Sequence, residues 1–138
     1  MTDLVREYFI ERGCARHVID GGLEHLIRSW ESTARGLARG KEQQFDSYLN
    51  DLDGRDILEG VLEAVPACAQ PDHVRRIHEA DELVRRHTSP AEECLWGKAN
   101  QAHRGWMKAR QWWYWALPGS FEPGEEGLWP KPATSGWE

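Results

Sequence analysis

The chain has few cysteines and no long hydrophobic run. Its 138 residues include three cysteines, Cys14, Cys68 and Cys94, which lie far apart and form no C-x-x-C pair. Such a sparse, odd set is typical of free thiols in a reducing cytosol and not of a disulfide framework. The first residues, MTDLVREYF, carry acids where a signal peptide is apolar. No stretch approaches the roughly 18 apolar residues of a membrane span. We therefore expect a cytoplasmic protein without a membrane segment.

Motifs for phosphate binding, nucleophilic catalysis and metal binding are also missing. The segment GLARGK lacks the Walker spacing, and the chain contains no G-x-S-x-G. The spacings of Cys14 with His17 and of Cys68 with His73 match no established zinc pattern. Cysteine–histidine catalysis stays open, although nothing positions either cysteine as a nucleophile. We predict no cofactor, no metal ligand and no catalytic residue, with His73 and His87 half-buried and structural.

The composition is that of one globular domain with an acidic balance. Hydrophobic residues make up 40% of the chain and charged residues 29%, so a core forms without staples. The formal net charge is −6. This charge disfavours non-specific binding to nucleic acid or to an anionic membrane, and it steers a basic partner toward the protein.

Apolar residues recur at helical spacing along most of the chain. Between Leu23 and Leu37 they fall within one arc of about 100°, the stripe of an amphipathic helix. The other sets with this spacing are Phe45–Leu52, Ile57–Val65 and Val74–Val84, with Leu4–Ile10 as a shorter one. No alternating strand pattern of useful length is present. We predict an all-α domain of five or six amphipathic helices.

Two local signals predict where helices break and begin. Gly54 is expected to break or bend the chain between the second and third apolar sets. Ser89, Pro90 and Glu92 form a capping-box signature. That signature predicts a helix that buries Ala91, Cys94, Leu95, Ala99 and Ala102.

Composition changes at Pro118, where a segment rich in Pro and Gly begins. No helix is compatible with this composition. The spacing of Phe121, Leu128, Trp129 and Trp137 favours an extended arm laid over the helices, at least as far as Trp129, over a disordered tail. We predict a helical domain over residues 1–117 and an arm over residues 118–138 that packs on the same domain.

Acidic residues are concentrated between Glu42 and Val65. This stretch carries seven acids and one base, Arg55, so its net charge equals that of the whole chain. Asp56, Glu59 and Glu63 point away from the apolar stripe of their helix and are predicted to form an exposed acidic ridge. Three interpretations are open: a solvated face, a docking face for a basic protein, and paired catalytic carboxylates. The last is weakest, because exposed acids seldom have the raised pKa that acid catalysis needs.

Large aromatic residues are concentrated in the segment HRGWMKARQWWYWAL, residues 103–117, together with three cations and no acid. One interpretation is single-stranded nucleic-acid binding by base stacking, and a second is a membrane interface. The third is structural: Trp112, Trp113 and Trp115 pack on the helices, and the basic residues lie near the acidic ridge. The net charge favours the structural interpretation, with one aromatic edge available to a partner.

Three segments together resemble a known group of proteins: GGLEHLIRSWESTARG, FDSYLNDLDGRDILEGVLEAV and WWYWALP. They resemble small acidic, helical, largely uncharacterised bacterial proteins of immunity-protein-like character. The middle segment reads YLNDLDGR over Tyr48–Arg55, a slight departure from the pattern. The resemblance covers roughly half the chain and implies stoichiometric binding. It transfers no residue role, and a helix N-cap at Asp53 with an internal salt bridge of Arg55 would explain both residues structurally.

We therefore predict a non-enzymatic binding protein, most concretely an immunity protein that neutralises a basic bacterial toxin. The predicted partner-binding residues are Asp46, Asp51, Asp53, Asp56, Glu59, Glu63, Trp112 and Trp113. One alternative is a small-molecule-binding or enzymatic helical domain with a pocket lined by His and Trp near His73 or His87. The other is a single-stranded nucleic-acid-binding module that uses the Trp/Arg cluster around Arg110.

Overall fold

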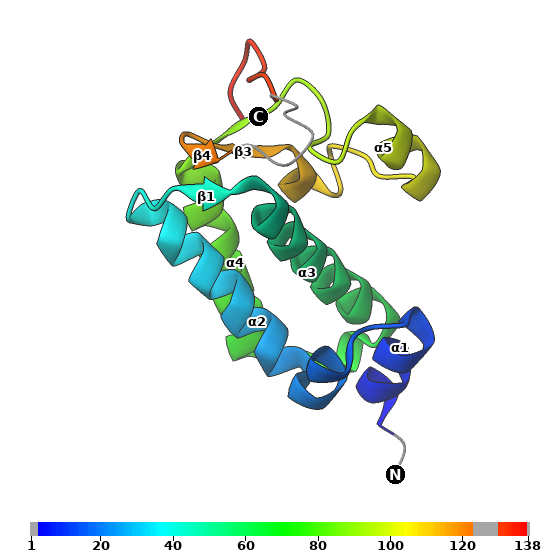
Figure 1. Cartoon of the computed structure of the whole chain (residues 1–138). Helices are drawn as coiled ribbons and strands as arrows, with labels where there is room; N and C mark the ends of the chain where they lie inside the picture. The colour runs from blue at the N-terminus through cyan, green and yellow to red at the C-terminus, as the bar shows by residue number, and fades with distance from the viewer. Residues whose placement is uncertain (1–2, 123–129, 138) are drawn as a thin grey trace.

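Helices account for most of the computed structural model, which describes residues 3–122 and 130–137. The α-helices in these ranges are α1 (Leu4–Arg12), α2 (Arg16–Ala38), α3 (Phe45–Ala64), α4 (Pro71–Arg86) and α5 (Lys98–Arg104). Helices α2, α3 and α4 form the long body of the molecule, with α1 at one end and α5 toward the other (Figure 1). Within the described ranges no helix combines the length and apolar character needed to cross a bilayer. The single mostly helical domain agrees with the prediction.

The apolar stripe of α2 is buried as its spacing predicts. Leu26, Ile27 and Trp30 are each less than 5% exposed and face α3 and α4. The helix is interrupted at Gly22, whose φ of 66° and ψ of −159° are not helical. Only glycine adopts this conformation without strain, so Gly22 sets the angle between the first turns of α2 and the rest.

Helix α3 passes through Gly54 without a break, so the predicted bend is wrong. Leu52 and Leu58, on either side of Gly54, are both fully buried. A glycine inside a helix costs only about 1 kcal/mol, and burial of the two leucines outweighs that cost. The buried stripe is continuous because Arg55 also points into the protein interior, where it is 4% exposed.

The helix predicted from the capping box at Ser89 does not form there. Thr88–Pro90 is instead strand β2, which pairs antiparallel with strand β3, Ala116–Pro118. Helix α5 begins only at Lys98, and its Ala99 and Ala102 are exposed. The predicted core residues Ala91, Cys94 and Leu95 are buried from a loop.

A second pair of short strands departs from the predicted all-α fold. Strand β1, Gln43–Gln44, pairs in parallel with β4, Phe121–Glu122. Short 3₁₀ turns occur at η1 (Pro66–Cys68) and η2 (Trp112–Trp115). The pair β2–β3 joins the end of the Trp-rich segment to the chain that follows α4. The pair β1–β4 joins the start of the arm to the chain that precedes α3 (Figure 1).

The described parts of the arm contact the helical domain as predicted. The backbone N–H of Ala133 donates to the carbonyl of Pro90, at 2.8 Å. The indole N–H of Trp137 donates to the carbonyl of Thr88, and its ring meets Trp112 edge to face. Leu128 and Trp129, the other predicted anchors, lie outside the described residues.

Buried residues form two apolar clusters along the helical body. The larger contains the Trp112–Leu117 segment with the second half of α2 and the first half of α3. The smaller joins α1 to the first half of α2 and the second half of α3. On α3, Arg55 lies between Leu52 of the larger cluster and Leu58 of the smaller one, and it forms a buried ion pair with Asp81 of α4. The carboxylate of Asp81 accepts from Arg55 Nε and Nη2, both at 3.0 Å, and from Trp30 Nε1 at 2.8 Å.

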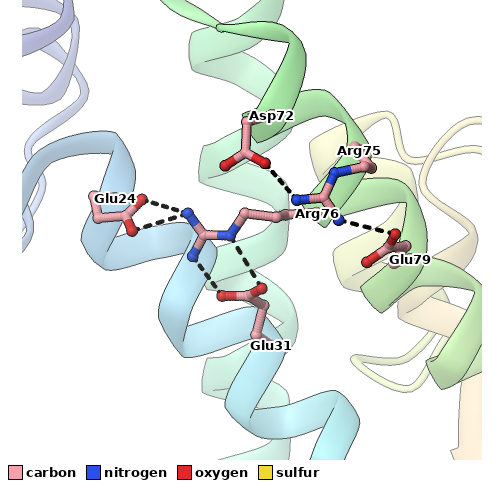
Figure 2. Close-up of polar contacts among 6 residues, drawn as sticks. All are labelled: Glu24, Glu31, Asp72, Arg75, Arg76 and Glu79. Carbon is pink, nitrogen blue, oxygen red and sulfur yellow. Dashed lines mark hydrogen bonds and ion pairs between the residues drawn. The ribbon is translucent and has the colours of Figure 1, made fainter.

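A second arginine ties α4 to α2 nearer the surface. Arg76 donates to both oxygens of Glu31 and, through Nη1, to both oxygens of Glu24 (Figure 2). Figure 2 also shows Arg75 between Asp72 and Glu79, both on α4. Arg76 therefore bridges two helices, whereas Arg75 makes pairs within one.

Candidate functional site

A cleft of about 930 Å³ runs along the outer side of α3. Helix α1 lines one end of it, and α5 with the loops around it lines the other. Figure 1 shows α1 and α5 on the same side of α3, near its opposite ends. Gly13, the left-handed C-cap of α1, turns the chain there and places Arg12 and Cys14 at the cleft.

Helix α3 presents one face to this cleft. Asp53, Asp56, Gly60 and Glu63 all line it. Their spacings of three, seven and ten residues from Asp53 place them on one side of a helix. Gly60 is required by the packing of α1, because a Cβ atom there would lie 2.1 Å from the hydroxyl oxygen of Tyr8.

The predicted ridge of exposed acids is neutralised by arginines of the same chain. Asp56 pairs with Arg12 at 3.1 Å, and Glu63 pairs with Arg110 at 2.9 Å. Glu59 pairs with the buried Arg55 at 3.0 Å. The side chain of Asp56 is only 15% exposed. The predicted exposed ridge is therefore confirmed only at Glu63, because Asp56 and Glu59 are half-buried, and all three acids are paired with arginines. The predicted pairing of Arg110 with this region and the internal salt bridge of Arg55 are confirmed.

The acids in the first half of α3 differ from those in the second half. Asp46, Asp51 and Asp53 make no ion pair with any described residue, and Asp46 and Asp51 are exposed. Asp53 is not a helix N-cap, because α3 begins eight residues earlier at Phe45. The acids of α3 that have no ion pair therefore all lie on its first half.

Asp53 is the most precisely held of these carboxylates. Its Oδ1 atom accepts a hydrogen bond from the indole N–H of Trp96 at 3.0 Å and another from the hydroxyl of Tyr114 at 2.8 Å. Its Oδ2 atom accepts no hydrogen bond from the described residues. Two donors on one oxygen fix the orientation of the carboxylate and leave the other oxygen as an acceptor beside the cleft.

Aromatic rings surround this carboxylate. Trp106 stacks on Tyr114, with ring centroids 3.8 Å apart and an angle of 19° between the planes. Trp96 and Trp106 are both half-buried and line the cleft. Burial, with the charges of Asp56 and Asp53, raises the pKa of Tyr114, so its hydroxyl stays protonated and donates. Trp96 was not predicted as a site residue. The one local signal near it is Gly97, which follows it and marks a turn.

The opposite end of the cleft contains a pair of opposite charge. Arg12 donates to the Tyr8 hydroxyl at 2.9 Å and to Asp56 at 3.1 Å. Burial raises the pKa of Asp56, and the contact with Arg12 only partly offsets this. Arg104, the last residue of α5, lines the cleft at its other end and makes no ion pair with the described residues. Sequence analysis missed Arg12, because its partner lies 44 residues away.

Nothing in the described cleft activates a nucleophile. Burial raises the pKa of the Cys14 thiol, which favours the unreactive protonated form. His73 accepts a hydrogen bond from the backbone of Gln70 and so caps α4. His87 is the exposed C-cap of α4, and neither histidine lines the cleft.

A smaller cavity, about 260 Å³, lies on the other flank of α3. His17 and His25 of α2 line it, with ring centroids 5.7 Å apart. Asp53 lines both this cavity and the cleft. In the part of the chain that the structure describes, no group of three or more metal-ligating side chains gathers.

Trp112 and Trp113 are not available as anchors for a partner. They are 8% and 1% exposed, and they pack into the larger apolar cluster with Trp115. Arg85 lies over the Trp112 ring and Arg55 over the Trp113 ring. The prediction that these two tryptophans bind a partner is wrong, and the structural interpretation of the Trp-rich segment is confirmed. No protein-family model, curated protein or solved structure matches the chain.

Proposed function

We propose that this protein is a non-enzymatic, stoichiometric binding protein for a basic protein partner. It acts in the cytoplasm, as its free thiols suggest. The partner binds over the first half of α3 and the cleft beside it. The most concrete form of this function is that of an immunity protein that neutralises a basic toxin.

One observation carries the proposal: Asp53 is an acid of α3 without an ion pair, it lines the cleft, and its carboxylate is held by hydrogen bonds from Trp96 and Tyr114. Asp46 extends the negative surface along the same face of α3, two turns away, whereas Asp51 lies on the flank that faces α2, near Thr33 and Lys41. Acids without an ion pair in the same chain attract a basic surface and raise its rate of association. Aromatic residues beside them supply the apolar area that tight interfaces need.

The nucleic-acid alternative has less support. The tryptophans that would stack bases are in the core, and Arg110 is paired with Glu63. The small-molecule alternative keeps the cleft but loses its predicted place, because neither His73 nor His87 lines it.

Capture from an extract of the cells that make the chain tests the proposal. The bait is the full chain, and it is compared with the triple variant Asp46→Asn, Asp51→Asn, Asp53→Asn. A control variant, Glu79→Gln, Glu82→Gln, Glu92→Gln, removes the same charge from three exposed acids elsewhere. The captured protein is then purified, and its affinity and the mass of the complex are measured.

We expect one basic protein in a complex of fixed stoichiometry, held more weakly as salt increases. The α3 variant should raise Kd by about tenfold or more, and the control variant should change it by less than about threefold. An acidic partner, or equal weakening by the two variants, contradicts the proposal.

A further inference from the structure

We propose that the part of the cleft between Asp53 and Trp106 binds a guanidinium group, presented by an arginine of the partner. This inference deepens the proposed function by naming the chemical group that the cleft recognises. It rests on the geometry around Asp53 and on a comparison with a second site in the same chain.

The buried carboxylate of Asp81 shows what such a site looks like when it is filled. Its Oδ1 atom accepts from an indole N–H, that of Trp30, as Oδ1 of Asp53 accepts from Trp96. At Asp81 the arginine Arg55 spans both carboxylate oxygens, at 3.0 Å each. At Asp53 the second donor to Oδ1 is the hydroxyl of Tyr114, and no described residue donates to Oδ2.

An aromatic ring completes both arrangements. The guanidinium of Arg55 lies 4.4 Å from the ring centroid of Trp113. Trp106 is half-buried, lines the same cleft as Asp53, and stacks on Tyr114, whose hydroxyl donates to Asp53. A guanidinium is planar and weakly hydrated, so it pairs with a carboxylate and stacks on an indole at the same time. An ammonium group makes the ion pair but stacks less well, which favours arginine over lysine.

The charges that line the cleft permit a cation. Its carboxylates are Asp53, Asp56 and Glu63, and its arginines are Arg12 and Arg104. Arg12 forms an ion pair with Asp56. Glu63 forms one with Arg110, which does not line the cleft. Asp53 is therefore the one acid of the described lining that has no ion pair and can receive a guanidinium.

Titration of the full chain with small cations tests this site without the partner. The probes are Nα-acetylarginine amide, the lysine analogue, and the citrulline analogue, which has the shape of arginine without its charge. The readout is the indole ¹H–¹⁵N resonance of Trp96, which reports on its bond to Asp53. The variant Trp96→Phe assigns that resonance.

The key variant is Asp53→Asn, which keeps an oxygen for Trp96 and Tyr114 and removes the charge. Glu92→Gln is the control, because it removes the charge of an exposed acid that has no ion pair among the described residues and does not line the cleft. We expect a saturable shift with arginine amide at a Kd of about 1–20 mM. Lysine amide should bind more weakly, and citrulline should give no saturable shift. Asp53→Asn should weaken arginine binding at least about fivefold, and Glu92→Gln less than about twofold.

Equal shifts with arginine and citrulline on the unaltered chain overturn the inference, whether or not the variants fold. So does the absence of a saturable shift up to about 100 mM, or equal weakening by the two variants. If arginine amide binds through Asp53 but the captured partner is not basic, the site stands and the proposed function fails. If a basic partner depends on the α3 acids but arginine amide does not bind, only this inference fails.

Discussion

The buried pair of Arg55 and Asp81 allows the sharpest test of how the three long helices are held. We consider the substitution Asp81→Ala. It removes three hydrogen bonds at once, two from Arg55 and one from Trp30. The Arg55 side chain is 5% exposed and keeps only Glu59, which is itself 35% exposed. Leaving a buried charge without its main partner costs about 3–5 kcal/mol. The indole N–H of Trp30, buried and without its acceptor, adds about 1–3 kcal/mol.

These costs are a large part of the roughly 5–15 kcal/mol that stabilises a domain. The assay is urea unfolding followed by circular dichroism, with the double variant Arg55→Met, Asp81→Leu as comparison. Replacing both charges with apolar groups avoids the unpaired charge, so the double variant should be at least about 2 kcal/mol more stable than Asp81→Ala. A loss below about 1 kcal/mol for Asp81→Ala, or a double variant no more stable than the single one, would refute the reasoning.

Two further predictions use unfolding free energies. Gly54→Ala should stabilise the protein by about 0.5–1 kcal/mol, because nothing lies within 4 Å of the added Cβ. Gly60→Ala should be less stable than Gly54→Ala by at least about 1 kcal/mol, because its Cβ displaces the Tyr8 hydroxyl; the reverse order would show that α1 does not pack there. The hydrogen bond from Arg76 lowers the pKa of Glu31, so the stability from this pair is present above the unfolded pKa of about 4.3 and is lost as pH falls through the folded pKa. Arg76→Met should therefore flatten the decline in urea midpoint between about pH 5 and 3, and an unchanged slope would contradict it.

Helices with continuous apolar stripes were predictable from sequence, and α2 is the clearest case. Helix α3 was split in the prediction at Gly54, and the apolar spacing is also interrupted there because Arg55 occupies a position of the buried stripe. A charged residue inside a stripe hides the period, and only its partner on another helix explains why it is buried. That partner, Asp81, lies 26 residues away.

The capping-box signature failed for a related reason. Ser89 and Pro90 carry a genuine local preference for a helix start. Pairing with Leu117 and Ala116 gives the same backbone a partner that local sequence does not reveal. Tertiary pairing therefore overrides the local signal.

The candidate site was predictable in part. The concentration of acids on α3 is visible in the sequence, as is the unusual content of tryptophan. The division of the acids into paired and unpaired sets was not, because Arg12 and Arg110 reach α3 from 44 and 47 residues away. The distinction between Trp113 in the core and Trp106 at the cleft likewise depends on the three-dimensional fold.

The position of Trp112–Leu117 in the larger core cluster has a consequence for synthesis of the chain. Helices α2, α3 and α4 are complete at Arg86, but the cluster that joins them is filled only when Leu117 has been made. At typical translation rates the interval lasts about 2–6 s. During that time the growing chain has an open apolar face, and Asp53 lacks Tyr114 and, at first, Trp96. Core closure and assembly of the cleft around Asp53 therefore belong to one late step.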